Sequence, residues 1–370
     1  MDPELDYLPP KPRRLDYGIG CIGAGFIMRE CHLVAYRNAG FRVVAIATRP
    51  EGRPQAEEVA RLRQIPHVYS TVEELLVDPE IEIVDIAVPP HALLDVVRRV
   101  ASARSRVKGV LAQKPLGLNF AQAVEIVELC EGAGITLGVN QNMRYDQSVR
   151  ALHSLLRSGE LGEPVLATIE MRAIPHWMPW QKDYGWLTLR IMSIHHLDCF
   201  RFWFGDPARV YASVRTDPRT PFPHSDGICL YILEYENGLR CSAWDDVWTG
   251  PSREGAAGDI YIKWRVEGTD GLAWGAIGWP QYPVRVPSTL RFTTRRHTGQ
   301  WIEPHWDQVW FPDAFEGTMA QLLVAVENRT EPEISGRDNL KTMALVEAAY
   351  RSAVQRRAVE ISEIIEEHRK

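Results

Sequence analysis

The chain has 370 residues, of which 45% are hydrophobic and 24% charged, and its formal net charge is -6. A chain of this length usually forms two domains. No apolar run approaches the ~20 residues that cross a bilayer, and the basic residues form no stripe of the kind that binds nucleic acid. We therefore expect neither a membrane nor a nucleic-acid partner. The six cysteines include no C-x-x-C pair, which is typical of free thiols in a reducing compartment and predicts a cytoplasmic protein.

Residues 1–16 are rich in proline and charge, lack the apolar core of a secretory signal, and predict a surface or flexible N-terminal arm. The next segment alternates short apolar runs with amphipathic stretches. Strands that are apolar on both faces and alternate with helices indicate a parallel, doubly wound α/β sheet, here over residues 17–140. The predicted strands are 18–22, 43–47, 83–88, 109–112 and 135–139, and the predicted helices are 56–63, 72–76, 93–103 and 121–131.

Residues 141–370 have a different hydrophobic pattern, which predicts a second, α+β domain. Apolar and polar residues alternate with a period of two, and hairpin signals such as Glu236-Asn237-Gly238 separate the segments, so we expect a large, mostly antiparallel sheet. The predicted strands are 165–172, 210–215, 228–235, 239–244 and 260–266, with helices at 147–158, 189–204 and 339–353. The last helix closes the chain and could pack back on the first domain.

A glycine-rich turn follows the first predicted strand and precedes a helix. Read as G-x-G-x-x-G, it is Gly23-Ala24-Gly25-Phe26-Ile27-Met28, with methionine in the third glycine position. Such a turn directs backbone N–H groups and a helix N-terminus at a pyrophosphate. We therefore predict that Gly23, Gly25, Phe26 and Ile27 bind a dinucleotide; the alternative is a tight turn without a ligand.

The second strand ends in Thr48-Arg49 rather than in an acidic residue. A carboxylate there would bind the free ribose hydroxyls of NAD, whereas a hydroxyl and a guanidinium suit the 2'-phosphate of NADP. Arg49 could instead stack on the adenine or point to water. The sequence thus predicts NAD or NADP without deciding between them.

Two candidate catalytic residues come from different halves of the chain. Lys114 lies in Gln113-Lys114-Pro115, directly after a buried strand, where an ammonium could bind a substrate hydroxyl and stabilise a developing alkoxide. His195 lies in Ser193-Ile194-His195-His196-Leu197-Asp198 at the start of an apolar helix, and an imidazole is a natural base for a hydroxyl proton. The alternatives are a solvated lysine and a structural histidine capped by Asp198. No third ligand at suitable spacing is evident, so we predict no metal site.

These residues resemble the family named for glucose-fructose oxidoreductase, inositol dehydrogenase and the rhizopine-catabolism protein (Gfo/Idh/MocA), over nearly the whole chain. The motifs that carry the resemblance are the glycine turn, Val88-Pro89-Pro90, Gln113-Lys114-Pro115-Leu116, Asn140-Gln141-Asn142-Met143-Arg144-Tyr145, His195-His196-Leu197-Asp198 with Gly205, and Ser335-Gly336-Arg337-Asp338.

The resemblance implies an N-terminal Rossmann domain, a C-terminal domain whose open sheet often makes subunit contacts, and NAD(P)-dependent chemistry on a sugar, cyclitol or related polyol. A homo-oligomer, dimer or tetramer, formed through that sheet is therefore expected. By position, Lys114 matches the active-site lysine and His195 the catalytic histidine. Gly23, Gly25, Pro89, Gln113 and Asn140 match cofactor-side positions, and Lys114 is expected to contact the cofactor as well.

Three positions depart from the family pattern. Gln113 replaces a glutamate, Ile191 replaces a frequent aspartate, and Leu93 replaces a common histidine. The catalytic pair is present, but an acidic helper is not.

An aromatic segment, 176–186, mixes rings with hydrogen-bonding groups, as carbohydrate sites often do; alternatively it packs between subunits. We predict substrate contacts from Arg144, His176, Tyr184, His195 and Asp198.

The sequence as a whole predicts reversible hydride transfer between a secondary hydroxyl of a sugar, sugar derivative or cyclitol and a nicotinamide. Two alternatives remain: keto-sugar chemistry that recycles its cofactor, of the dehydratase or glycosidase type, and a nonenzymatic dinucleotide-binding regulatory protein.

Overall fold

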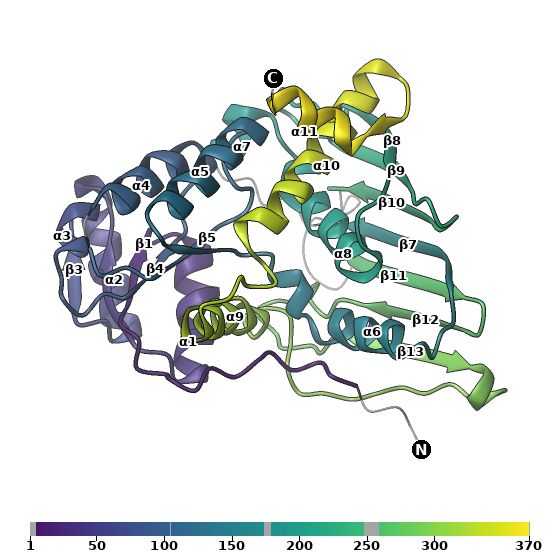
Figure 1. Ribbon diagram of the computed structural model, residues 1–370, viewed down its shortest axis with the longest axis horizontal. Coiled ribbons are helices and arrows are strands. Elements are labelled where there is room, and N and C mark those ends of the chain that lie inside the picture. The colour runs from purple at the N-terminus through teal and green to yellow at the C-terminus, as the bar shows by residue number, and fades with distance from the viewer. Residues whose placement is uncertain (1–4, 104, 174–178, 248–258, 370) are drawn as a thin grey trace. The chain divides into compact units, whose positions relative to one another are not determined.

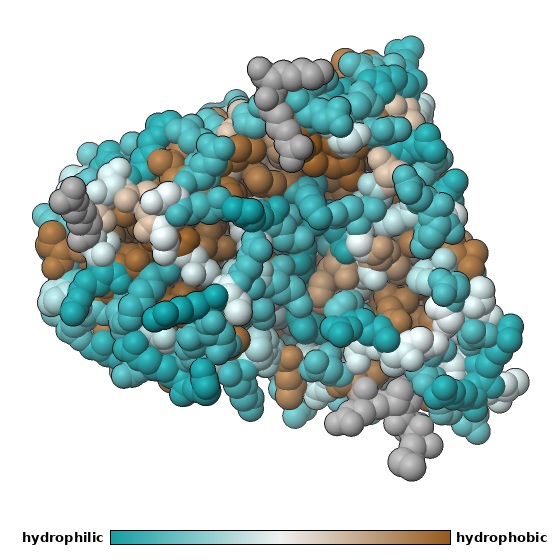
Figure 2. Space-filling view, viewed as in Figure 1, coloured by the Kyte–Doolittle hydropathy of each residue, from teal (hydrophilic) through white to brown (hydrophobic). Residues whose placement is uncertain are grey.

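The computed structural model describes residues 5–103, 105–173, 179–247 and 259–369. The chain forms two compact units. One contains residues 9–142 and 311–343, and we call it the Rossmann unit; the other contains residues 1–8, 143–310 and 344–370, and we call it the sheet unit. No helix in the described ranges is long and apolar enough to span a membrane. Most of the surface visible in Figure 2 is hydrophilic.

The Rossmann unit is built on a six-stranded parallel sheet with the order β3-β2-β1-β4-β5-β6. The order reverses next to β1, and ligands of open α/β sheets bind at the carboxyl ends of the strands beside such a reversal. The parallel, doubly wound sheet expected from the sequence is confirmed. The strands are β1 Ile19–Ile22, β2 Val43–Ala47, β3 His67–Tyr69, β4 Ile83–Ile86, β5 Gly109–Ala112 and β6 Thr136–Val139.

Helices cover both faces of this sheet (Figure 1). Between the strands lie α1 Leu33–Ala39, α2 Arg53–Arg63, α3 Val72–Leu76, α4 Pro90–Ser102 and α5 Phe120–Gly132. No helix is expected near residue 320 from the sequence, yet α9 Ala314–Asn328 packs against β5, β6 and α1. A methyl group on Gly109 of β5 would lie 2.9 Å from the Val326 side chain, so α9 lies close to the strand that precedes Lys114.

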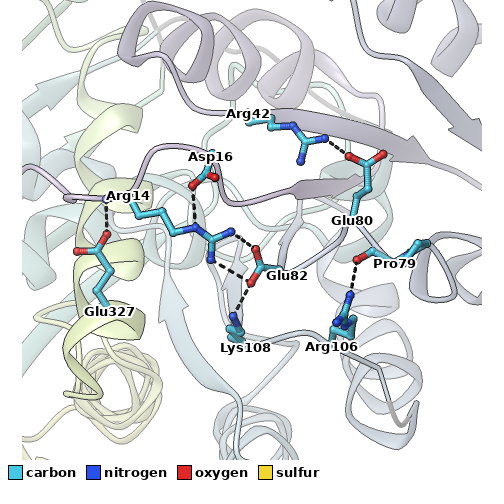
Figure 3. Close-up of polar contacts among 9 residues, drawn as sticks. All are labelled: Arg14, Asp16, Arg42, Pro79, Glu80, Glu82, Arg106, Lys108 and Glu327. Carbon is cyan, nitrogen blue, oxygen red and sulfur yellow. Dashed lines mark hydrogen bonds and ion pairs between the residues drawn. The ribbon is translucent and has the colours of Figure 1, made fainter.

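Arg13 and Arg14 of the N-terminal arm bind the Rossmann unit near the amino ends of its strands (Figure 3). The backbone N–H groups of Arg13 and Arg14 donate to the Glu327 carboxylate of α9, at 3.1 and 2.7 Å. The Arg14 guanidinium donates to both oxygens of Glu82, at 3.1 and 2.5 Å, and Lys108 donates to the same carboxylate. The arm therefore connects α9 to the start of β4.

The sheet unit contains an eight-stranded sheet with the order β13-β12-β11-β7-β10-β9-β8-β14. It is antiparallel except for the pair of β7 and β10, so the predicted mostly antiparallel sheet is confirmed. The strands are β7 Pro164–Arg172, β8 Arg209–Arg215, β9 Ile228–Glu234, β10 Arg240–Asp246, β11 Tyr261–Gly268, β12 Gly271–Ala276, β13 Thr289–Thr294 and β14 Val359–Glu360.

One face of this sheet is covered by α6 Gln147–Arg157 and α8 Ile194–Phe204 (Figure 1). Trp203 of α8 packs on Trp264 of β11, with ring centroids 5.7 Å apart. Tyr211, Leu230 and Ile232 point to the other face and are exposed, as is Leu166 of β7. This apolar set on β7, β8 and β9 is called the open face below.

The C-terminus differs from the expected closing helix. Helix α10 runs over Gly336–Gln355, and a further helix, α11 Ile361–Arg369, follows it. The prediction that the helix at 339–353 closes the chain is therefore wrong. Ile361 and Ile364 are buried, so α11 has a packed apolar side that the short segment did not reveal by itself.

Candidate active site

The glycine turn joins β1 to a π-helical turn, Ile27–His32, that leads into α1. Gly23 has a φ of 103°, and a methyl group there would lie 2.3 Å from the carbonyl oxygen of Ala87, so only glycine fits. Gly25 faces open space, with no atom within 4 Å of a methyl group placed on it. Met28, in the third glycine position, is fully buried. The substitution therefore lies on the packed side of the turn, while the open side keeps the shape of a phosphate cradle.

The residues that follow β2 lie at the same edge of the sheet. Thr48 continues the backbone pairing with its N–H donating to Tyr69 at 3.3 Å, and its hydroxyl oxygen is buried without a hydrogen-bond partner among the described residues. The Arg49 side chain is exposed. A hydroxyl and a guanidinium are thus available at the position where a dinucleotide-binding sheet holds the adenosine ribose.

Lys114 follows β5, and Gln113 lies between the strand and the lysine. The N–H of Gln113 donates to the carbonyl of Ile86 at 3.0 Å, which extends the pairing with β4. The backbone N–H of Lys114 donates to Oε1 of the Gln113 side chain at 2.9 Å. Burial lowers the pKa of the Lys114 ammonium to about 7. The lysine can therefore exchange a proton near neutrality, as acid and base catalysts do.

Asn140 follows β6 and is fully buried. Its N–H donates to the Ala112 carbonyl at 2.8 Å, and its side-chain Nδ2 lies 2.8 Å from Nε2 of His32. Its Oδ1 has no hydrogen-bond partner in the described part of the chain. Pro89, after β4, precedes the first residue of α4. The Rossmann unit thus brings together the residues predicted to bind the cofactor along one edge of its sheet.

Sequence reasoning missed two buried residues behind this edge, His32 and Asp85. Asp85 lies in the middle of β4, and its Oδ2 is 2.6 Å from Nδ1 of His32; both side chains are fully buried. The position of Asp85 in the sequence could have indicated such a pair, because an acidic residue inside a short apolar strand is almost never buried without a partner.

His195 lies in the first turn of α8, in the sheet unit. The expected helix at 189–204 consists of a π-helical turn, Leu189–Ser193, followed by α8. The buried carboxylate of Asp226 accepts hydrogen bonds from the N–H groups of Leu187 and Leu189, at 2.8 and 2.7 Å, and from the hydroxyl of Tyr350 at 2.7 Å. Burial raises the pKa of Asp226, and these hydrogen bonds oppose that shift. Asp226 therefore anchors the start of the segment that presents His195.

The His195 imidazole is 3% exposed and lies edge-on to Trp310, with ring centroids 6.1 Å apart. Its neighbour His196 points elsewhere and lies 2.9 Å from Asp245 of β10. Burial and packing of this kind limit the orientations that an imidazole can adopt.

Of the other predicted substrate contacts, three lie in the described part of the chain and one does not. Arg144 and Asp198 form a buried bidentate ion pair with each other, at 2.6 and 2.7 Å. Tyr184 ends α7, Pro179–Tyr184, with its ring 4.6 Å from the ring of Trp186. His176 lies outside the described residues.

The edge of the Rossmann unit fits a dinucleotide. The glycine turn has an open side, and two buried acceptors, Thr48 Oγ1 and Asn140 Oδ1, lack partners among the described residues. Buried polar atoms are almost always hydrogen-bonded in complete sites. A bound NAD or NADP would supply groups for them. Among the described residues, no cluster of three or more histidine, cysteine, aspartate or glutamate side chains could hold a metal ion.

Comparison with known proteins agrees with this geometry. Residues 17–141 match the GFO/IDH/MocA oxidoreductase family with its NAD-binding Rossmann fold, and residues 149–273 match the GFO/IDH/MocA C-terminal domain. The D-apiose dehydrogenase of Paraburkholderia graminis is 27% identical over 93% of this chain and 89% of its own. The 1,5-anhydro-D-fructose reductase of Ensifer adhaerens is 26% identical over 92% and 98%. An Agrobacterium radiobacter oxidoreductase, solved with NAD+, L-tartaric acid and magnesium, shares the fold with a TM-score of 0.79, 24% identity, and coverage of 94% of this chain and 99% of its own.

Proposed function

Because the chain belongs to the GFO/IDH/MocA oxidoreductase family, with an NAD-binding Rossmann domain, we propose that it transfers a hydride between a secondary hydroxyl of a sugar, sugar derivative or cyclitol and a nicotinamide, with Lys114 and His195 as the acid/base pair. The names of the two curated relatives, a D-apiose dehydrogenase and a 1,5-anhydro-D-fructose reductase, support the substrate class.

The observation that supports this proposal most directly is the state of Lys114. Lys114 follows the carboxyl end of β5, and burial lowers the pKa of its ammonium to about 7. An ammonium with such a pKa donates a strong hydrogen bond to an oxygen that gains negative charge, and it can release its proton near neutral pH.

In the oxidation direction, the substrate loses a hydride from carbon and a proton from its hydroxyl. His195 takes the hydroxyl proton on its imidazole, and Lys114 donates a hydrogen bond to the oxygen as the C–O bond becomes a C=O bond. The nicotinamide, when bound, supplies C4 as the hydride acceptor. In the reverse direction, His195 returns the proton to the oxygen.

The cofactor-side residues in this proposal are Gly23, Gly25, Phe26, Ile27, Thr48, Arg49, Pro89, Gln113, Lys114 and Asn140. Arg144, His176, Tyr184, His195 and Asp198 are proposed on the substrate side. Arg144 and Asp198 form an ion pair with each other, which supports an indirect role for them: the pair would hold α8, and with it His195, in position for the substrate.

We further propose that two or more copies assemble through the open face. Tyr211, Leu230 and Ile232 are between 45% and 51% exposed, and contiguous exposed apolar residues of this kind are typical of subunit contacts. All six cysteines are free and buried, which supports a reducing compartment, the cytoplasm.

The test is a panel of sugars, sugar lactones and inositols with NAD and NADP, followed at the nicotinamide absorbance. Lys114→Ala and His195→Ala should each lower kcat by about 100-fold or more, while cofactor binding measured by fluorescence persists in His195→Ala. Lys108→Ala is the matched control, because Lys108 precedes the same strand at its opposite end. Full turnover by either active-site variant would refute the proposed roles, and conversion of substrate without a net absorbance change would indicate a recycled cofactor.

A further inference from the structure

A chain of hydrogen bonds runs from the backbone of Lys114 to the interior of β4, inside the Rossmann unit. Lys114 N–H donates to Gln113 Oε1 at 2.9 Å, and Gln113 Nε2 lies 3.3 Å from His32 Nε2. His32 Nδ1 lies 2.6 Å from Asp85 Oδ2. The four groups come from β4, the segment that follows β5 and the π-helical turn before α1, so the contacts join three parts of the Rossmann unit.

The direction of these bonds follows from the first one. Because Gln113 Oε1 accepts the Lys114 N–H, the amide nitrogen of Gln113 is the group that faces His32. An amide nitrogen only donates, and Asn140 Nδ2 approaches the same imidazole nitrogen at 2.8 Å. Nε2 of His32 must therefore be the acceptor, and the ring proton resides on Nδ1, from which it is donated to Asp85.

Asp85 and Tyr36 hold this tautomer in place. The Tyr36 hydroxyl donates to the same oxygen of Asp85 at 2.6 Å. Burial, together with the nearby Asp85 charge, raises the pKa of Tyr36 well above its usual value, so the phenol stays protonated. The His32 ring also packs against Phe315 of α9, with centroids 5.0 Å apart. Packing and a buried carboxylate thus leave the imidazole little freedom to turn.

We propose that His32, in its Nδ1–H tautomer, is a positioning residue that fixes the Gln113 and Asn140 amides beside Lys114. Residue 113 then has to be an amide, because its N–H group donates to the unprotonated Nε2 of His32. The role of Lys114 in this inference rests on the proposed function, whereas the tautomer of His32 does not depend on it. A carboxylate at position 113 would turn an acceptor, and a negative charge, toward the lone pair of Nε2.

Exchange of the charge between positions 85 and 113 tests this arrangement. Gln113→Glu has nearly the same shape and should lower kcat about tenfold or more, because a buried acceptor is left facing an acceptor. Adding Asp85→Asn should restore most of the loss. In the double variant, the amide introduced at position 85 can donate to Nδ1 of His32. The proton on Nε2 can then be donated to the carboxylate introduced at position 113, so the ring reverses its tautomer. Asn140 Nδ2 lies 2.8 Å from the same nitrogen, so its amide has to turn and present Oδ1, which has no partner among the described residues.

The control is Gln122→Glu. Oε1 of Gln122 accepts the backbone N–H of Leu118 at 3.0 Å, a contact that a carboxylate preserves. This variant should keep its kcat. Thermal unfolding of all four proteins would show whether any loss of kcat follows from a loss of fold, and a merely structural defect would not be repaired by a second substitution.

The tautomer has a readout that does not depend on turnover. In protein with 15N-labelled histidine, long-range 1H–15N correlations distinguish Nδ1–H from Nε2–H, and the His32→Gln variant identifies the signal of His32 among the 11 histidines. We expect Nδ1–H in the natural protein and Nε2–H in the double variant. Nε2–H in the natural protein, or a double variant no more active than Gln113→Glu alone, would overturn the proposal. If Lys114→Ala keeps full turnover while the tautomers are as expected, the proposed function fails and the arrangement around His32 stands.

Discussion

The Arg144 guanidinium holds the Asp198 carboxylate with two parallel hydrogen bonds, Nε to Oδ2 at 2.6 Å and Nη2 to Oδ1 at 2.7 Å. Both side chains are at most 4% exposed. Arg144 precedes α6 and Asp198 lies in α8, so the pair links the chain entering the sheet unit to the helix that presents His195. The sequence suggested these residues as substrate contacts, whereas the geometry gives each of them a protein partner.

Removal of one member of this pair should therefore be costly. Asp198→Ala leaves the Arg144 charge buried without its carboxylate, and we expect a loss of about 3–5 kcal/mol in the free energy of unfolding, measured with urea. The double variant Arg144→Met/Asp198→Leu should lose much less, because the Arg144 charge is removed as well and Arg201, which also lies 3.8 Å from Asp198, keeps its ion pair with Asp206. A stable Asp198→Ala variant with a raised KM for substrate would instead indicate direct substrate contact.

The pH dependence of turnover should reflect Lys114. Its pKa is lowered from 10.5 to about 7, so the ammonium needed to stabilise the alkoxide is present below that pH and is lost as the pH rises through it. We expect kcat/KM to fall above about pH 7. Lys114→Arg, which stays charged, should turn over more slowly but lack this alkaline decline; an unchanged decline would assign it to another group.

Arg49 should affect the choice of cofactor. Its exposed guanidinium follows β2, where it can pair with a 2'-phosphate. Arg49→Ala should raise the Kd for NADP about tenfold and leave that for NAD nearly unchanged, as measured by cofactor fluorescence. Equal effects on both cofactors would indicate stacking on the adenine instead.

Glu82 should contribute to stability through the N-terminal arm (Figure 3). Burial raises its pKa, but the hydrogen bonds from Arg14 and Lys108 outweigh this, so the pKa lies below 4.5 in the folded protein. The stabilisation is therefore present above about pH 4.5 and is lost as the pH falls through the folded value. We expect Glu82→Gln to lose about 1.5 kcal/mol of unfolding free energy at pH 7, and the difference from the natural protein to shrink in acid. A constant difference between pH 7 and pH 3 would exclude this origin.

Charges on the open face should disrupt assembly. Leu230→Lys/Ile232→Lys replaces two neighbouring exposed residues of β9, and we expect a smaller particle in analytical ultracentrifugation. Val77→Lys is the control, since Val77 is 80% exposed in the Rossmann unit. An unchanged sedimentation coefficient in the β9 variant would place the subunit contact elsewhere.

Local patterns predicted much of the fold. Apolar runs of four to six residues identified five of the six parallel strands, because strands covered on both faces need no polar alternation. The strand His67–Tyr69 was missed, since three residues with partial exposure leave no pattern. Strands β12 and β13 were missed as well, and α9 was not expected, although it is the helix that packs on β5 and β6.

The sequence by itself determined most of the parallel strands and the helices between them, the glycine turn, and the strand ends from which Lys114 and Asn140 emerge, because these depend on residues close together in the chain. Only the tertiary structure decided the partners. It paired Arg144 with Asp198 across 54 positions and His32 with Asp85 across 53. Buried polar groups must find partners wherever the fold brings them, and that choice leaves no periodic signal in the chain.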